Sequence, residues 1–184
     1  MHLFNVDHAQ LLLVDVQAKL FPHIDANAQI ALRAKQLLTG AQALNIPITI
    51  VEQYPQGLGP TLPELLQICP TAPTFIKQTF SALKTPDISQ HLDKQNRQQL
   101  IILGTESHVC VLQTALDAKR SGYDVILAWD ACGSRYDEDK RLAEARLRDA
   151  ECQLVSAEML LFEWLESREH AQFSAIIAQL RQAQ

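Results

Sequence analysis

Short, nearly continuous apolar runs alternate along this chain with longer segments of helical periodicity, and this alternation limits the possible folds more than any other feature. Apolar runs that predict strands lie at 9–14, 48–51, 74–76, 99–103, 125–128 and 153–155. Runs of this kind are typical of parallel sheets that are buried on both faces. We therefore predict an α/β protein: a three-layer α/β/α, Rossmann-like fold with a central, mostly parallel six-stranded sheet.

The segments between these runs carry apolar residues at steps of three and four, which places those residues on one face of a helix. The longest such segment runs from Ile24 to Leu44, and others lie at 109–121, 137–151, 157–165 and 170–181. The segment Glu52–Pro60 is rich in Gly and Pro and predicts a shaped loop. No repeat or linker interrupts the 184 residues, so we expect one domain over 1–184.

Composition and charge narrow the class of partner. Apolar residues make up 47% of the chain and charged residues 20%, which is typical of a soluble globular protein. The net charge of −5 and the lack of a basic stripe argue against a nucleic-acid partner and leave a small-molecule substrate as the expectation. No apolar run approaches the roughly 20 residues of a membrane span. The N-terminus has no signal-peptide pattern, so we predict a cytoplasmic protein without a membrane partner.

Three reactive side chains follow the ends of predicted strands. Asp15 ends the first strand, Lys77 ends the third, and Cys110 begins the helix after the fourth. Because the crevice of an open parallel sheet lies beyond the carboxyl ends of its strands, these side chains should meet there. An ammonium group and a helix N-terminus would lower the pKa of the thiol, and an aspartate could take its proton. The arrangement is that of a cysteine nucleophile with backbone N–H groups nearby for an oxyanion.

Each of these residues also has an ordinary structural interpretation. A cysteine at a helix start often packs in the core, an aspartate can cap a turn, and a lysine is usually solvated. His108, two residues before Cys110, could form a Cys–His pair, but residues two apart need not face each other. A binding or interaction module that keeps a hydrolase fold is therefore a second hypothesis. A nucleotide-binding flavodoxin-like protein is disfavoured because neither GxGxxG nor GxxxxGK[ST] occurs.

Several segments resemble the conserved blocks of isochorismatase-like cysteine hydrolases. The three that match catalytic blocks are Leu12–Gln17, Phe75–Ala82 and Gly104–Val111, and Asp130–Arg135 is similar to the segment after the fifth strand. The loop Glu52–Thr61 resembles that of the branch called isochorismatase domain-containing proteins. The resemblance extends from about residue 11 to residue 165.

The resemblance implies a catalytic triad of Asp15, Lys77 and Cys110, in which Cys110 forms a thioester acyl-enzyme that water hydrolyses. It also implies a non-proline cis peptide near Thr105–Glu106 and oxyanion donors in the backbone N–H groups of Glu106 and Cys110. The residues that we expect to line the substrate pocket are Gln17, Phe21, Tyr54, Phe80, Glu106 and His108.

Departures from the family patterns narrow the chemistry. Nicotinamidases of this superfamily carry an Asp and His metal motif after the second strand, where this chain has Gln53, Tyr54 and Gln56. With no CxxC pair either, we expect no metal, no cofactor and no disulfide. True isochorismatases lack the cysteine, so Cys110 indicates hydrolysis of an amide or a related carbonyl compound. Family members are commonly oligomeric, which implies a homo-oligomer, a dimer or a tetramer.

Overall fold

A computed structural model describes residues 3–181 and contains a single six-stranded sheet in the order β3-β2-β1-β4-β5-β6. Every neighbouring pair of strands is parallel. Met1 and His2, which belong to the N-terminal segment without a signal-peptide pattern, lie outside the described residues. The strands are β1 (Ala9–Val14), β2 (Ile48–Gln53), β3 (Thr74–Lys77), β4 (Gln99–Thr105), β5 (Asp124–Gly133) and β6 (Gln153–Val155).

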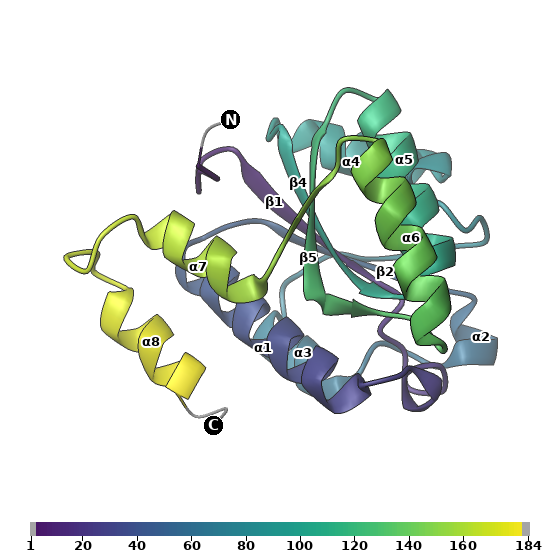
Figure 1. The fold of residues 1–184 in the computed structure, drawn as a ribbon, viewed down its shortest axis with the longest axis horizontal. Coiled ribbons are helices and arrows are strands. Elements are labelled where there is room, and N and C mark those ends of the chain that lie inside the picture. Colours follow the sequence, from purple (N-terminus) through teal and green to yellow (C-terminus); the bar gives the residue numbers. More distant parts are fainter. Residues whose placement is uncertain (1–2, 182–184) are drawn as a thin grey trace.

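Helices cover both faces of the sheet (Figure 1). One face packs against α1 (Asn27–Ala43), α3 (Pro63–Ile68), α7 (Ala157–Leu165) and α8 (Phe173–Arg181). The other packs against α4 (Pro86–Lys94), α5 (Leu112–Arg120) and α6 (Asp137–Asp149). The short α2 (Pro55–Leu58) follows β2. This arrangement confirms the predicted three-layer α/β/α fold, and no helix within 3–181 is long and apolar enough to cross a bilayer.

The differences from the predicted elements have local causes. Helices α2, α3 and α4 were not predicted, and each begins with a proline, which is favourable in the first turn of a helix because the missing N–H would be unpaired there. The helix predicted at 109–121 begins at Leu112, after a π-helical turn at Ser107–Val111. Strand β5 continues past Ala128 to Gly133 because it pairs with β4 again beyond a bulge.

The strand order reverses between β1 and β4, which is where an open α/β sheet forms its crevice. Residues at three strand ends on this edge have left-handed backbones: Asp15 after β1 with φ 54°, Tyr54 after β2 with φ 39°, and Glu106 after β4 with φ 57°. Left-handed residues other than glycine cost free energy and cluster at functional sites. Three of the eight non-glycine residues with positive φ within residues 3–181 thus lie at this edge, beside the crevice that the strand order predicts.

Gly104 in β4 allows the two central strands to approach each other at this edge. Its φ is 142°, and a Cβ atom there would overlap the backbone carbonyl of Val14 in β1. We expect Gly104→Ala to lower the free energy of unfolding by about 2–3 kcal/mol, measured by urea denaturation. Gly122→Ala is the matched control, because Gly122 has φ 92° but open space around its Cβ position. Equal losses in the two variants would contradict the steric explanation.

Candidate active site

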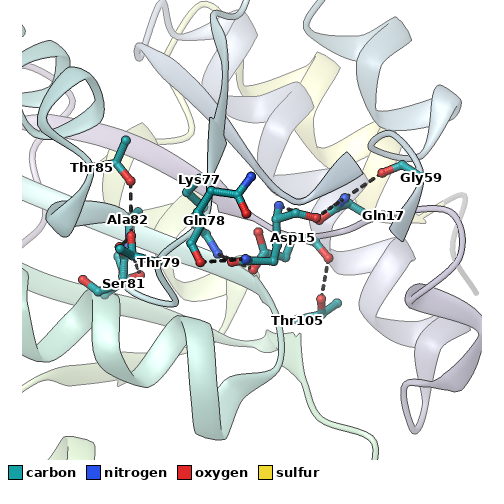
Figure 2. A network of polar contacts seen from close by, with 12 residues as sticks. Asp15, Gln17, Gly59, Lys77, Gln78, Thr79, Ser81, Ala82, Thr85 and Thr105 are labelled. Carbon is teal, nitrogen blue, oxygen red and sulfur yellow. Dashed lines mark hydrogen bonds and ion pairs between the residues drawn. The ribbon is translucent and has the colours of Figure 1, made fainter. Parts of the chain in front are cut away.

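A buried ion pair lies at the carboxyl edge of the sheet. The Lys77 Nζ donates to Asp15 Oδ2 at 2.8 Å (Figure 2). It also donates to Gln53 Oε1 at 2.7 Å. The side chains of Lys77 and Asp15 are 0% and 1% exposed. Strands β1, β2 and β3 each supply one of these residues at or directly after their last position. Because a buried ammonium needs compensation, the pair fixes both side chains in place.

Cys110 lies in the π-helical turn after β4, next to this ion pair. The residue is 5% exposed, and both Asp15 and Lys77 influence its thiol. Burial raises the pKa of Cys110 to about 12, the negative charge of Asp15 adds to this shift, and Lys77 opposes it. Lys77 lowers the pKa of this thiol, as expected from the sequence, but burial and the Asp15 carboxylate outweigh the ammonium, so the net shift is upward. The thiol is protonated at neutral pH.

Asp15 has the features of a group that could take that proton. Burial raises the pKa of Asp15 above its ordinary value, and the Lys77 ammonium opposes the shift. Its second oxygen, Oδ1, is buried and makes no hydrogen bond of good geometry within residues 3–181. The Thr105 Oγ1 donates to the backbone carbonyl of Asp15 at 2.5 Å and joins the ends of β1 and β4 (Figure 2). The carboxylate thus keeps one free oxygen in a rigid setting.

The turn between β4 and Cys110 differs from the expected one. All peptide bonds within residues 3–181 are trans, so the cis peptide expected near Thr105–Glu106 is absent. The chain turns instead through the left-handed conformation of Glu106, with φ 57° and ψ 57°. The N–H of Glu106 has no hydrogen-bond partner among the described residues. A free N–H directly before the π-helical turn is placed as an oxyanion donor would be.

A cavity of about 340 Å³ opens at these groups. Four of the predicted site residues line it: Asp15, Phe80, Glu106 and Cys110. Five others that the sequence analysis did not assign to the pocket complete the wall: Leu20, Gln53, Leu58, Val109 and Arg135. Of these five, Gln53, Leu58, Val109 and Arg135 lie in segments that carry the family resemblance, whereas Leu20 lies outside them. The walls are mostly apolar apart from Asp15, Cys110, Gln53 and the pair of Glu106 and Arg135.

Lys77 lies behind the cavity, where it holds Asp15, and Gln17 also has a structural position. The Gln17 side-chain amide donates to the carbonyl oxygens of Gln53 at 3.0 Å and Gly59 at 2.6 Å, and its oxygen accepts from the Gln53 N–H at 2.8 Å. Both ends of the amide are engaged by the backbone, and Figure 2 shows the contact with Gly59. Gln17 therefore shapes the loop after β2 and does not line the cavity.

The other three predicted pocket residues lie outside the cavity wall as well. Phe21 is 7% exposed and belongs to the apolar core against α1, while Tyr54 is 51% exposed. A ring nitrogen of His108, Nδ1, lies 3.0 Å from Ser134 Oγ, and Nε2 lies 3.6 Å from a carboxylate oxygen of Glu106. Because His108 interacts with these residues, the structure lends no support to a Cys–His pair.

No group of three or more His, Cys, Asp or Glu side chains suited to a metal lies within 3–181. The four cysteines are free thiols, and each is buried. Cys132 on β5 is in contact range of the Ile102 carbonyl, 3.9 Å from its sulfur, and packs in the core. Among the four, Cys110 is the one that lines the cavity beside Asp15.

Fold and site together define a class: a doubly wound α/β protein of the hydrolase type, with a thiol and a buried carboxylate–ammonium pair at the switch point of its sheet. The sequence matches the isochorismatase domain over residues 9–159. It is 38% identical over 169 residues to isochorismatase domain-containing protein 2A of Mus musculus, covering 90% of this chain and 79% of that protein. The chain belongs to the isochorismatase family.

Solved structures support the same assignment. MAR1 ribonuclease from Caenorhabditis elegans superposes with a TM-score of 0.92 at 30% identity, covering 98% of this chain and 93% of that one. YcaC from Pseudomonas aeruginosa, described with hexane-2,5-diol and covalent acrylamide, superposes with a TM-score of 0.93 at 26% identity over the same shares. The isochorismatase-like hydrolase fold is therefore established for this chain.

Proposed function

We propose that the protein hydrolyses a small-molecule amide or a related carbonyl compound through a triad of Asp15, Lys77 and Cys110. The observation that carries the proposal is the placement of the Cys110 thiol at the active-site cavity, beside a buried Asp15 that is held by Lys77. A nucleophile, a base and a group that orients the base are the parts that covalent acyl transfer requires.

In the first step Asp15 takes the proton of the Cys110 thiol while the sulfur attacks the carbonyl carbon of the substrate. The carbonyl oxygen becomes an oxyanion, for which we assign the N–H groups of Glu106 and Cys110 as donors. When the carbon–nitrogen bond breaks, Asp15 passes its proton to the leaving amine, and a thioester to Cys110 remains. Because the thiol has a pKa of about 12, the proton transfer and the attack must be closely coupled.

In the second step a water molecule attacks the thioester. Asp15 takes a proton from this water, and the carbon–sulfur bond breaks as the carboxylic acid leaves. The proton on Asp15 returns to the sulfur and restores the thiol. Lys77 keeps its hydrogen bonds to Asp15 and Gln53 throughout and so positions the base. No cofactor enters this sequence.

The size and the walls of the cavity favour a small substrate. A volume of about 340 Å³ and mostly apolar walls suit a compact organic molecule. The description of Pseudomonas aeruginosa YcaC with covalent acrylamide is consistent with a small amide in a cavity of this fold. The C. elegans neighbour is named as a ribonuclease, so RNA belongs among the compounds to be tested. The net charge of −5 and the apolar walls favour the small molecule.

The test is intact-protein mass spectrometry after incubation with a panel of small amides and esters, with a labelled RNA run in parallel. We expect at least one compound to leave an acyl adduct on the wild-type protein and none to do so on Cys110→Ala. The matched control is Cys152→Ala, which removes another buried thiol and should keep the adduct. An adduct that survives Cys110→Ala would contradict the proposal, as would RNA cleavage that depends on Cys110 without any acylation.

The second hypothesis, a binding or interaction module that retains the fold, predicts a different result. In that case no compound would give turnover dependent on Cys110, while a ligand or protein partner would still bind stably. The buried ion pair argues for the enzyme, because a binding module has no need to hold a carboxylate beside a thiol in the core.

A further inference from the structure

A second ion pair lies in the wall of the active-site cavity, separate from Asp15 and Lys77. The Arg135 Nε and Nη2 donate to the two carboxylate oxygens of Glu106 at 3.0 Å and 3.5 Å. The Glu106 side chain is 10% exposed, whereas that of Arg135 is 49% exposed. His108 also approaches Glu106, with 3.6 Å between Nε2 and a carboxylate oxygen. Glu106 is thus held from two sides, and Arg135 is the member of the pair that can reach a ligand.

Arg135 has N–H donors that make no hydrogen bond within the described residues. A guanidinium group carries five N–H donors, and only Nε and Nη2 take part in hydrogen bonds within the described part of the chain. The Gln53 amide in the same wall is engaged at both ends, because its oxygen accepts from Lys77 and its nitrogen donates to Gln78. The remaining walls are apolar and come from Leu20, Leu58, Phe80 and Val109. The cavity therefore has a reactive thiol and one set of unpaired cationic donors among apolar walls.

We propose that Arg135 selects substrates that carry a carboxylate away from the scissile carbonyl, an inference that rests on the function proposed above. Glu106 occupies the Nε–Nη2 edge of the guanidinium and fixes its orientation, which leaves the Nη1–Nη2 edge for a ligand. Two parallel N–H donors match the two oxygens of a carboxylate. Apolar walls strengthen this contact, while the neighbouring Glu106 reduces it, so the selectivity is moderate.

Matched thiol-reactive acrylamides test this inference without a known substrate. The probes are N-acryloyl derivatives of glycine, β-alanine and 4-aminobutyrate, each paired with its neutral primary carboxamide. The Cys110 sulfur adds to the terminal carbon of the double bond and its proton goes to the adjacent carbon. Nothing leaves, so the mass gain equals the mass of the probe. The measured quantity is the ratio of the labelling rates of the carboxylate and carboxamide members of each pair.

We expect Arg135→Gln to lower this ratio about fivefold for the spacer that fits best, because the two-donor contact with the carboxylate is lost and its partial exposure keeps the effect small. Arg135→Lys keeps the positive charge but not the two parallel N–H donors, so its ratio of labelling rates should lie between those of the wild-type protein and Arg135→Gln. Glu106→Gln should raise the ratio, since it removes the competing carboxylate. The control is Arg120→Gln, which removes an exposed arginine paired with Asp117 outside the cavity and should leave the ratio unchanged. A ratio that does not change in Arg135→Gln overturns the inference.

A binding measurement separates this inference from the proposed nucleophile. The unreactive N-propanoyl analogues of the same pairs are titrated by calorimetry into the wild-type protein and Arg135→Gln. If the wild-type protein prefers the carboxylate analogue and Arg135→Gln does not, the result supports the role of Arg135 in carboxylate binding, even when no acrylamide labels Cys110. The absence of labelling would then count against Cys110 as the nucleophile alone. If the acrylamides label Cys110 but the wild-type protein and Arg135→Gln show the same binding preference for the carboxylate, the role of Arg135 alone is overturned.

Discussion

Lys77→Met is expected to lower the free energy of unfolding by about 3–5 kcal/mol, because it leaves the Asp15 carboxylate buried without its partner. The methionine keeps the apolar stem of the lysine, so lost packing adds little. Gln53 loses the donor to its side-chain oxygen in the same variant. Urea denaturation at neutral pH gives the free energy of unfolding, and turnover should be lost as well.

The double variant Asp15→Asn/Lys77→Met tests whether the loss of stability in Lys77→Met comes from the uncompensated charge of Asp15 or from the changed shape of the side chain. If the loss in Lys77→Met comes from an uncompensated charge, removing that charge should restore a large part of the stability while turnover stays absent. Lys84→Met is the surface control, because Lys84 is exposed and its replacement should change stability by less than about 0.5 kcal/mol. A Lys77→Met protein as stable as the control would contradict the account of a buried, coupled pair.

The sequence predicts the positions of those site residues that directly follow the ends of strands. Asp15 and Lys77 each follow an apolar run whose end is visible in the sequence, and parallel strands bring their carboxyl ends to one edge. Cys110 follows β4 by a short turn and is placed by the same rule. Six strands and their parallel arrangement follow from the same local pattern of apolar runs.

The cavity wall and the pKa of the thiol could not be predicted in this way. Arg135 reaches the cavity because β5 runs past a bulge to Gly133, and the apolar pattern of that strand ends earlier. Gln17 is adjacent to a catalytic block, but its amide is used by the backbone of the loop after β2. The pKa of Cys110 depends on a balance between burial and two opposite charges, which requires the packed structure.

Asp15→Asn is expected to lower turnover by a factor of about 10²–10⁴, because an amide cannot take the thiol proton. The same substitution should move the pH dependence of Cys110 alkylation by iodoacetamide toward lower pH. The reason is the sign of the electrostatic effect, since the negative charge of Asp15 raises the pKa of this thiol and Lys77 lowers it. In the wild-type protein, a pKa of about 12 means that the alkylation rate keeps rising through the alkaline range.

These opposite changes distinguish a base from a residue that only supports the fold. A loss of structure would expose all four cysteines and label them together, whereas removal of the base should ease ionisation of Cys110 alone while turnover falls. Asp130→Asn is the matched control, because Asp130 is a partly buried carboxylate outside the cavity whose pKa is also raised by burial. That variant should leave both turnover and the alkylation profile of Cys110 unchanged. An Asp15→Asn protein that is folded and retains its turnover would exclude Asp15 as the base, and the thiol would then need another acceptor for its proton.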